Sequence, residues 1–150
     1  GEYDAIVLAA AGLIRLGQKE IITQYLDDTM MVPAVGQGAL CIETRENDPD
    51  IAKIMAALDH ADTRICVTGE RAFLQQIEGS CHIPVACHGT INGSDVTLTA
   101  VVASEDGSSV VRRQVTSPAG QVEAAGRSLA DEVLENGGRQ ILECIDSNDK

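Results

Sequence analysis

The chain has 150 residues, a formal net charge of −12, and 44% hydrophobic but only 2% aromatic residues. This apolar fraction is enough for one medium domain or two small ones and argues against disorder. The acidic balance argues against binding to nucleic acid or to an anionic membrane, because both attract basic proteins.

The first part of the sequence predicts a piece of an α/β layer. Residues 4–12 form a continuous apolar run ending in glycine, which is typical of a strand buried on both faces of a parallel sheet. A short helical turn closed by Gly17 should follow. Gly36 and Gly38 then predict a tight turn, and residues 39–44 predict a second strand. A dinucleotide-binding fingerprint is excluded, because the third glycine is absent and no helix follows the motif.

Two helices are predicted next. The first starts at Asp48, the cap, with Pro49 in its first turn. Asp59 or Asp62 should cap the second, which closes at Gly79. The apolar residues of the first helix share one face: Ile51, Ile54, Met55 and Leu58. The buried stripe of the second comprises Ile65, Gly69, Ala72, Phe73 and Ile77.

Beyond Cys81 the hydrophobic period changes from helical to alternating. Asn92 and Gly93 predict a tight hairpin turn between two strands, and a third strand should cover residues 110–116. A helix over about residues 121–135 and a last short helix after the next two glycines complete the pattern. The second half is therefore predicted to be an α+β module, with the boundary near residues 59–64.

Two Cys-His pairs, Cys81-His82 and Cys87-His88, raise the question of a metal site. Neighbours on a strand point to opposite faces, so the members of a pair cannot easily share an ion. On an extended strand Cys81 and Cys87 would lie roughly 20 Å apart. We expect no metal, since four ligands must meet in a tetrahedron. Cys87 is interpreted as a strand residue that packs as a small hydrophobe. Cys41, Cys66 and Cys144, each inside an apolar segment, are likewise expected to pack as small hydrophobes.

Cys81 differs from the other cysteines in its position. It follows a short stretch with a glycine between a predicted helix and a predicted strand. A thiol on such a loop can approach a ligand closely. From the residues alone, a passive loop cysteine is the preferred interpretation, because many loop cysteines are passive.

Arg15 and Arg45 stand out in a chain with 11 basic residues. Each follows a predicted strand or short turn, and ligands bind at strand ends in α/β sheets. The planar guanidinium donates two parallel hydrogen bonds to a carboxylate, so these residues predict a carboxylate-bearing ligand. The alternative is a pair of surface arginines neutralised by acids such as Glu43 and Glu46.

Three stretches together carry a family resemblance: residues 3–17, 32–45 and 70–85. They resemble, in order and spacing, segments of hydroxymethylbilane synthase, also called porphobilinogen deaminase, and the likeness runs over nearly the whole chain. The chain resembles the C-terminal portion of that enzyme, without its first domain and the start of its second. The implied fold is α+β: a three-stranded antiparallel sheet packed with helices, preceded by a partial α/β segment like that of periplasmic binding proteins. Residues 1–60 would be the partial second domain with the crossover, and residues 61–150 the C-terminal domain.

The resemblance implies a transferase of tetrapyrrole and haem biosynthesis. The family joins four porphobilinogen units head to tail, releases ammonia at each step and frees the linear hydroxymethylbilane. The chain grows on a dipyrromethane cofactor held by a thioether, here to Cys81, and an inert carbon–sulfur bond suits a primer that survives many turnovers. Arg15 and Arg45 match family arginines that bind the carboxylates of the cofactor and the growing chain.

The sequence also departs from the family pattern. Where family members often have another cleft arginine this chain has Ile21, and Ser80 replaces the usual glycine before the cofactor cysteine. The catalytic aspartate of the family belongs to the first domain, so no catalytic residue is assigned here. We therefore expect this portion alone to be inactive.

The expected surroundings of the protein follow from these observations. The odd number of cysteines, five, and the absence of a signal segment favour a reducing compartment, the cytoplasm. The expected partners are porphobilinogen and linear pyrrole intermediates, with no nucleic acid and no membrane. The complete enzyme is expected to be monomeric, and this portion to self-associate through apolar residues 6–8. The alternative is a non-catalytic α+β module that binds a ligand or partner chain.

Overall fold

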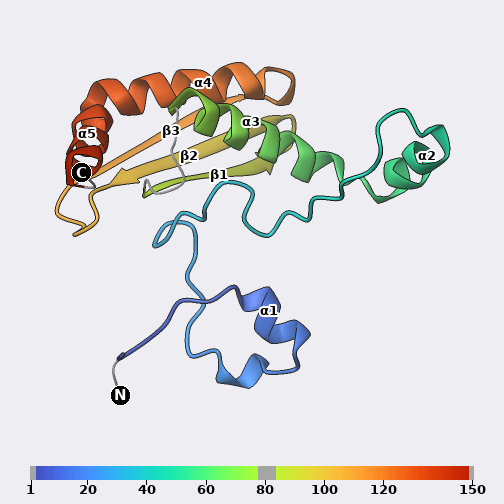
Figure 1. The fold of residues 1–150 in the computed structure, drawn as a ribbon, viewed down its shortest axis with the longest axis horizontal. Helices are drawn as coiled ribbons and strands as arrows, with labels where there is room; N and C mark the ends of the chain where they lie inside the picture. Colours follow the sequence, from blue (N-terminus) through green and yellow to red (C-terminus); the bar gives the residue numbers. More distant parts are fainter. Residues whose placement is uncertain (1–2, 78–83, 149–150) are drawn as a thin grey trace. The chain divides into compact units, whose positions relative to one another are not determined.

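The computed structural model describes residues 3–77 and 84–148, with side chains as far as Cys144. The chain forms two units, Gly1–Met31 and Val32–Lys150. Their α-helices and strands are labelled in Figure 1.

The first unit contains one helical turn and a 3-10 turn. Helix α1 (Ala10–Arg15) is followed by η1 (Lys19–Ile21). The turn predicted before Gly17 is confirmed, since the Gly17 N–H donates to the Ile14 carbonyl at 3.0 Å. The strand predicted over residues 4–12 is wrong: no described residue pairs with residues 4–9, and the chain is helical from Ala10. A short apolar run cannot distinguish strand from helix, and its alanines favour a helix.

The second unit begins with an irregular segment that leads into α2 (Pro49–Leu58). The predicted glycine turn is confirmed, because Gly36 and Gly38 have φ of 71° and 83°, values that other residues rarely adopt. The strand predicted over residues 39–44 is absent from the described structure, and Leu40 is 92% exposed. Strand-like residues form a strand only when a neighbouring strand supplies hydrogen bonds, and no described segment does so here.

Helix α2 begins as its sequence predicts. The Asp48 side chain accepts the N–H of Ile51 at 3.1 Å, which makes it the cap. The apolar stripe is present, but Ile54 and Leu58 are more than half exposed. None of the α2 residues is buried, so packing contributes little to this helix.

Helix α3 (Ala61–Ile77) carries the predicted buried stripe, in which Ile65 is only partly buried, but a different cap. The predicted closing Gly79 lies outside the described residues. His60 Nδ1 accepts the N–H of Thr63 at 3.3 Å. Asp59 instead forms an ion pair with Arg64 at 2.9 Å. The prediction of Asp59 or Asp62 as the cap is therefore wrong, because the helix begins directly after His60 and Asp62 already lies in its first turn.

The sheet is a three-stranded antiparallel meander. Strands β1 (Val85–Asn92), β2 (Asp95–Ala103) and β3 (Val110–Pro118) lie in the order β1-β2-β3. The predicted hairpin turn is confirmed, since Asn92 pairs with Asp95 and Gly93 lies between them. One face of β2 is fully buried and comprises Val96, Leu98, Ala100 and Val102.

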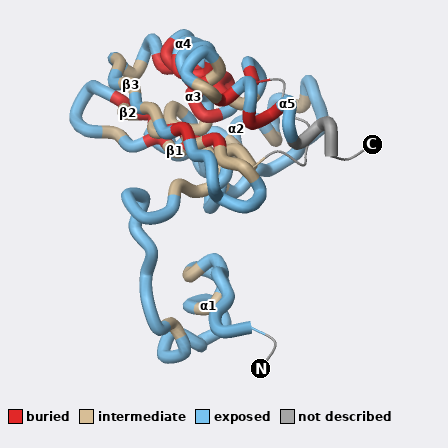
Figure 2. Tube along the Cα trace, turned by 90° about the vertical axis from the view of Figure 1, so that its left-hand side faces the viewer, coloured by how far each residue is buried: buried red, intermediate tan, exposed pale blue. Residues whose placement is uncertain are grey.

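Helices α3 and α4 (Val122–Val133) lie together over one face of this sheet (Figure 1). The 3-10 turn η2 (Ala119–Gln121) precedes α4, and η3 (Leu134–Gly138) joins it to α5 (Arg139–Asn148). The predicted break at the two glycines is confirmed by a kink at Gly137, where φ is 110°. Figure 2 shows the buried residues gathered in the strands and in α3, α4 and α5. The α+β class of this unit is thus confirmed, whereas the α/β segment expected before it is not seen.

Candidate functional site

The residue on which the sequence analysis placed most weight, Cys81, lies outside the described residues, as do His82 and Ser80. The described chain reaches Ile77 at the end of α3 and resumes at Pro84, directly before β1.

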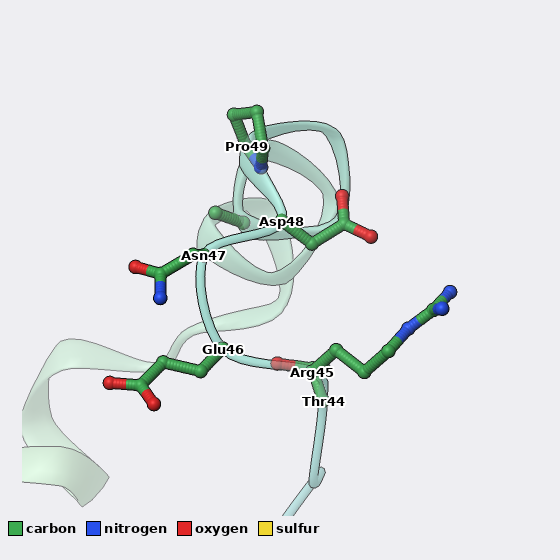
Figure 3. A pocket seen from close by; sticks show the side chains of 7 residues that line it. Thr44, Arg45, Glu46, Asn47, Asp48 and Pro49 are labelled. Atoms are coloured by element: carbon green, nitrogen blue, oxygen red, sulfur yellow. The ribbon is translucent and has the colours of Figure 1, made fainter.

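Arg45 lies beside an open depression of about 540 Å³ at the start of α2. In Figure 3 the Arg45 side chain extends away from that of Glu46, which points to the opposite side of the backbone. Asn47 has a left-handed φ of 62°, which turns the chain sharply into the helix cap. The depression is lined by Thr44, Arg45, Glu46, Asn47, Asp48, Pro49 and Ala52.

The Arg45 guanidinium is available to an external anion. None of the ion pairs between described residues includes it, so pairing with Glu43 or Glu46 is not seen. Arg45 is exposed, and its fork of donors suits a carboxylate. This environment is compatible with binding of an acidic ligand.

Arg15, the other arginine selected from the sequence, lies in the first unit. It is the last residue of α1 and is exposed, and no described carboxylate forms an ion pair with it. Ile21 is the last residue of η1 and is 57% exposed. Arg15 and Arg45 thus belong to different units.

A second hollow, of about 330 Å³, contains a residue that the sequence analysis missed. Glu70 of α3 is only 3% exposed. Its carboxylate accepts the N–H of Gly36 at 2.7 Å and the N–H of Gly89 at 2.8 Å. His88 Nδ1 lies 3.6 Å from Glu70 Oε1. One feature of the sequence could have indicated Glu70: it directly follows Gly69 of the predicted buried stripe. A glutamate at such a position is rarely buried unless it is paired, so it marks a candidate polar site.

The two partly or fully buried cysteines near this hollow are poor nucleophiles. Burial, and secondarily the charge of Glu70, raises the pKa of Cys87 to about 12. Burial also raises the pKa of Cys66, with smaller contributions from Glu70 and Asp62. Both thiols therefore stay protonated at neutral pH, and the thiol is much less reactive than the thiolate.

The interpretation of Cys87 as a strand residue is confirmed, whereas the expectation that Cys41 and Cys144 pack as small hydrophobes is wrong, because both are exposed. Cys87 lies in β1 with a fully buried side chain, whereas neighbouring His88 is one-third exposed. Within residues 3–77 and 84–148 no group of three or more metal-ligating side chains comes together. None of the helices in these ranges is long and apolar enough to cross a membrane.

Fold and site together define an α+β domain attached to a segment whose exposed Arg45 forms no ion pair with a described residue and suits acidic ligands. Comparison with known families assigns both parts. Residues 1–53 match the family model described as porphobilinogen deaminase, dipyromethane cofactor binding domain. Residues 64–135 match the one described as porphobilinogen deaminase, C-terminal domain. The chain belongs to the porphobilinogen deaminase family and corresponds to a C-terminal portion of it, as the sequence resemblance indicated.

Similar proteins from several bacteria agree with this assignment. The chain is 46% identical over 140 residues to a porphobilinogen deaminase of Pelobacter propionicus, a match that covers 93% of this chain and 45% of the relative. It is 41% identical over 147 residues to one of Alkaliphilus metalliredigens, covering 98% and 46%. The chain thus spans about half the length of the curated relatives it matches. The expectation of a dipyrromethane-binding family is confirmed by the first family model.

Proposed function

We propose that this chain is the cofactor-carrying portion of a transferase of tetrapyrrole and haem biosynthesis. The complete enzyme joins four porphobilinogen units into hydroxymethylbilane and releases ammonia at each step. The observation that carries the proposal is the order of the two family matches, cofactor-binding domain before C-terminal domain, along one chain. A dipyrromethane, when bound, supplies the pyrrole carbon to which the first substrate unit is joined.

Cys81 is proposed as the thioether anchor of the dipyrromethane. It falls inside the range that matches the C-terminal domain of the family. Two other cysteines are unsuited to the task, because Cys87 is fully buried and the pKa of Cys66 is raised. Excluding Cys66 and Cys87 supports Cys81 as the anchor. Cys41 and Cys144 are exposed, so they serve as controls in the mutagenesis of Cys81.

Arg15 and Arg45 are proposed to bind the acetate and propionate carboxylates of the cofactor and the growing chain. Both are exposed, and neither forms an ion pair with a described residue, so neither guanidinium has to leave a protein carboxylate to bind a ligand. Charge-assisted, bidentate hydrogen bonds are the strongest contacts available to such a ligand. Since both residues fall in the cofactor-domain match, the assignment agrees with the family.

The remaining proposals concern the organisation of the enzyme. We divide the chain into residues 1–60, part of the second domain with the crossover, and residues 61–150, the C-terminal domain; the ranges of the family matches support this division. The complete enzyme acts as a monomer in the cytoplasm, where the free thiols stay reduced. This portion alone is inactive and self-associates through Ile6, Val7 and Leu8, each more than half exposed.

The decisive experiment joins these 150 residues to the preceding portion of the Pelobacter propionicus relative. The chimera should convert porphobilinogen to hydroxymethylbilane, measured as uroporphyrin after acidification and oxidation. Intact mass should show a dipyrromethane adduct. Cys81→Ala should abolish both the adduct and the turnover, whereas Cys41→Ala, which removes an exposed thiol, should preserve both. An active Cys81→Ala chimera would refute the anchor.

A further inference from the structure

Glu70 is a buried charge with an unusual set of partners. It lies in α3, beside the predicted buried stripe, and is 3% exposed. A carboxylate removed from water must be hydrogen-bonded or paired to remain charged. The described basic group that forms an ion-pair contact with it is His88, at 3.6 Å, beyond normal hydrogen-bond length. Its close partners are instead two backbone N–H groups, one on each carboxylate oxygen.

The first of these N–H groups belongs to the edge of the sheet. Strand β1 is an edge strand, paired only with β2 within the described sheet. Gly89 lies opposite Leu98 in that pair, yet its N–H donates to Glu70 Oε1 at 2.8 Å. In an antiparallel pair alternate N–H groups point away from the partner strand. Glu70 therefore supplies the acceptor that a further strand would otherwise provide.

The second N–H group belongs to the glycine turn. Gly36 donates to Glu70 Oε2 at 2.7 Å from a position far away in the sequence. Two successive turn hydrogen bonds, Gln37 to Ala34 at 2.9 Å and Ala39 to Gly36 at 3.0 Å, fix the backbone on either side. We call residues 34–39 the crossover turn. Its shape presents one inward N–H to the α+β domain.

Apolar packing supports the same contact. Val35, next to Gly36, packs against the hydrophobic core built by α3, α4 and the sheet. After the turn, residues 40–47 are all exposed, so the crossover turn holds the last partly buried residues of the chain before Arg45. The apolar contact of Val35 and the charge-assisted hydrogen bond of Gly36 are adjacent, so together they attach this turn to the domain.

We propose that Glu70 is a clamp, a positioning residue that fixes the crossover turn to the free edge of β1. The role of this clamp rests on the proposed function. By holding the crossover turn, Glu70 fixes the point on the Cys81-carrying domain from which the segment with Arg45 extends. Glu70 acts through the backbone of Gly36 and does not itself touch a pyrrole.

Site-resolved amide hydrogen exchange of this chain tests the clamp. In the unmutated protein the amides of Gly36 and Gly89 should be protected, whereas that of exposed Leu40 exchanges freely. Glu70→Ala should accelerate exchange at both glycines at least tenfold and leave Leu129 in α4 unchanged. Glu70→Gln, which keeps one acceptor oxygen, should protect one glycine more than the other.

The matched control is Glu123→Gln, which removes the same charge from an exposed ion pair with Arg127 in α4. It should leave exchange at Gly36 and Gly89 as it is. If Glu70→Ala accelerates all amides equally, the residue only stabilises the fold and the clamp is refuted. If Glu70→Ala does not fold, the unmutated chain and Glu70→Gln decide. An unprotected Gly36 amide in the unmutated chain refutes the clamp. A protected Gly36 amide, together with unequal protection of the two glycines in Glu70→Gln, supports the clamp. No pyrrole enters this test, so its outcome is separate from that of the Cys81 proposal.

Discussion

Gly126 of α4 lies directly against the backbone of Gly69 in α3: a Cβ added to Gly126 would stand 2.3 Å from the Gly69 carbonyl oxygen. Gly69 is also crowded, since a Cβ there would lie 2.5 Å from the side-chain atom Val122 Cγ2. The two helices that cover the sheet can approach this closely only because both positions lack a side chain.

Gly126→Ala should therefore destabilise the protein by about 1–3 kcal/mol, the usual cost of overpacking a filled interior. The opposing group is backbone and cannot rotate away. Urea unfolding monitored by circular dichroism measures the change. Gly120→Ala is the matched control, because a Cβ there meets nothing within 4 Å. An equal loss in both variants would contradict the packing argument.

Cys87 should make the protein sensitive to alkali. Its pKa is raised from 9.0 to about 12 in the folded state, mainly by burial. The unfolded chain therefore loses this proton at lower pH than the folded chain, so the stabilisation is complete below about pH 9 and is lost as pH rises towards 12. The loss amounts to at most about 4 kcal/mol.

The measurement is the free energy of unfolding from denaturant titrations between pH 8 and 11, under reducing conditions. Cys87→Val removes the thiol, so its stability should fall less steeply over this range. Cys41→Val, at an exposed site, should retain the slope of the unmutated protein. Identical slopes in all three proteins would show that Cys87 does not titrate as described.

Asp48→Ala should weaken α2 by about 1 kcal/mol, because the Ile51 N–H loses its acceptor. The effect should be local, since α2 has no buried residue through which to affect the core. Amide exchange within α2 detects it. Asp50→Ala, in the same turn, breaks only an exposed ion pair with Lys53 and should change exchange much less. A loss of stability in the whole sheet would contradict this view of α2.

Arg45→Gln should lower kcat/KM for porphobilinogen about tenfold to a hundredfold in the chimera described above. One charge-assisted contact to a carboxylate is worth about 1.5–3 kcal/mol. Arg64→Gln is the control: it breaks the ion pair with Asp59 but removes no unpaired guanidinium. If the two variants show equal activity, Arg45 does not bind the ligand.

The sequence was most informative where an element depends on its own residues. The cap at Asp48, the buried stripe ending at Ile77 and the turn at Gly93 are all local patterns, and each appears as predicted. The strands predicted at residues 4–12 and 39–44 failed because strand formation depends on a neighbour, which a local pattern cannot supply.

The residues of the candidate site also differ in how far the sequence could predict them. Arg45 could be selected from its residue type and position, and it forms no ion pair with a described residue. Glu70 could not, because its partners Gly36 and Gly89 lie 34 and 19 residues away. Only the folded chain brings these three residues together. The assignment of Cys81 came from the family resemblance and remains a prediction for the chimera to test.

The contact between Glu70 and Gly89 also bears on how the domain behaves in a crowded solution. An edge strand with unpaired N–H groups is a template for pairing with another chain, which leads to aggregation. At Gly89 that template is interrupted by an acidic side chain, and Gly36 of the crossover turn lies against the same carboxylate. Variants that lose this carboxylate are therefore expected to precipitate more readily on mild heating than their loss of stability alone would explain.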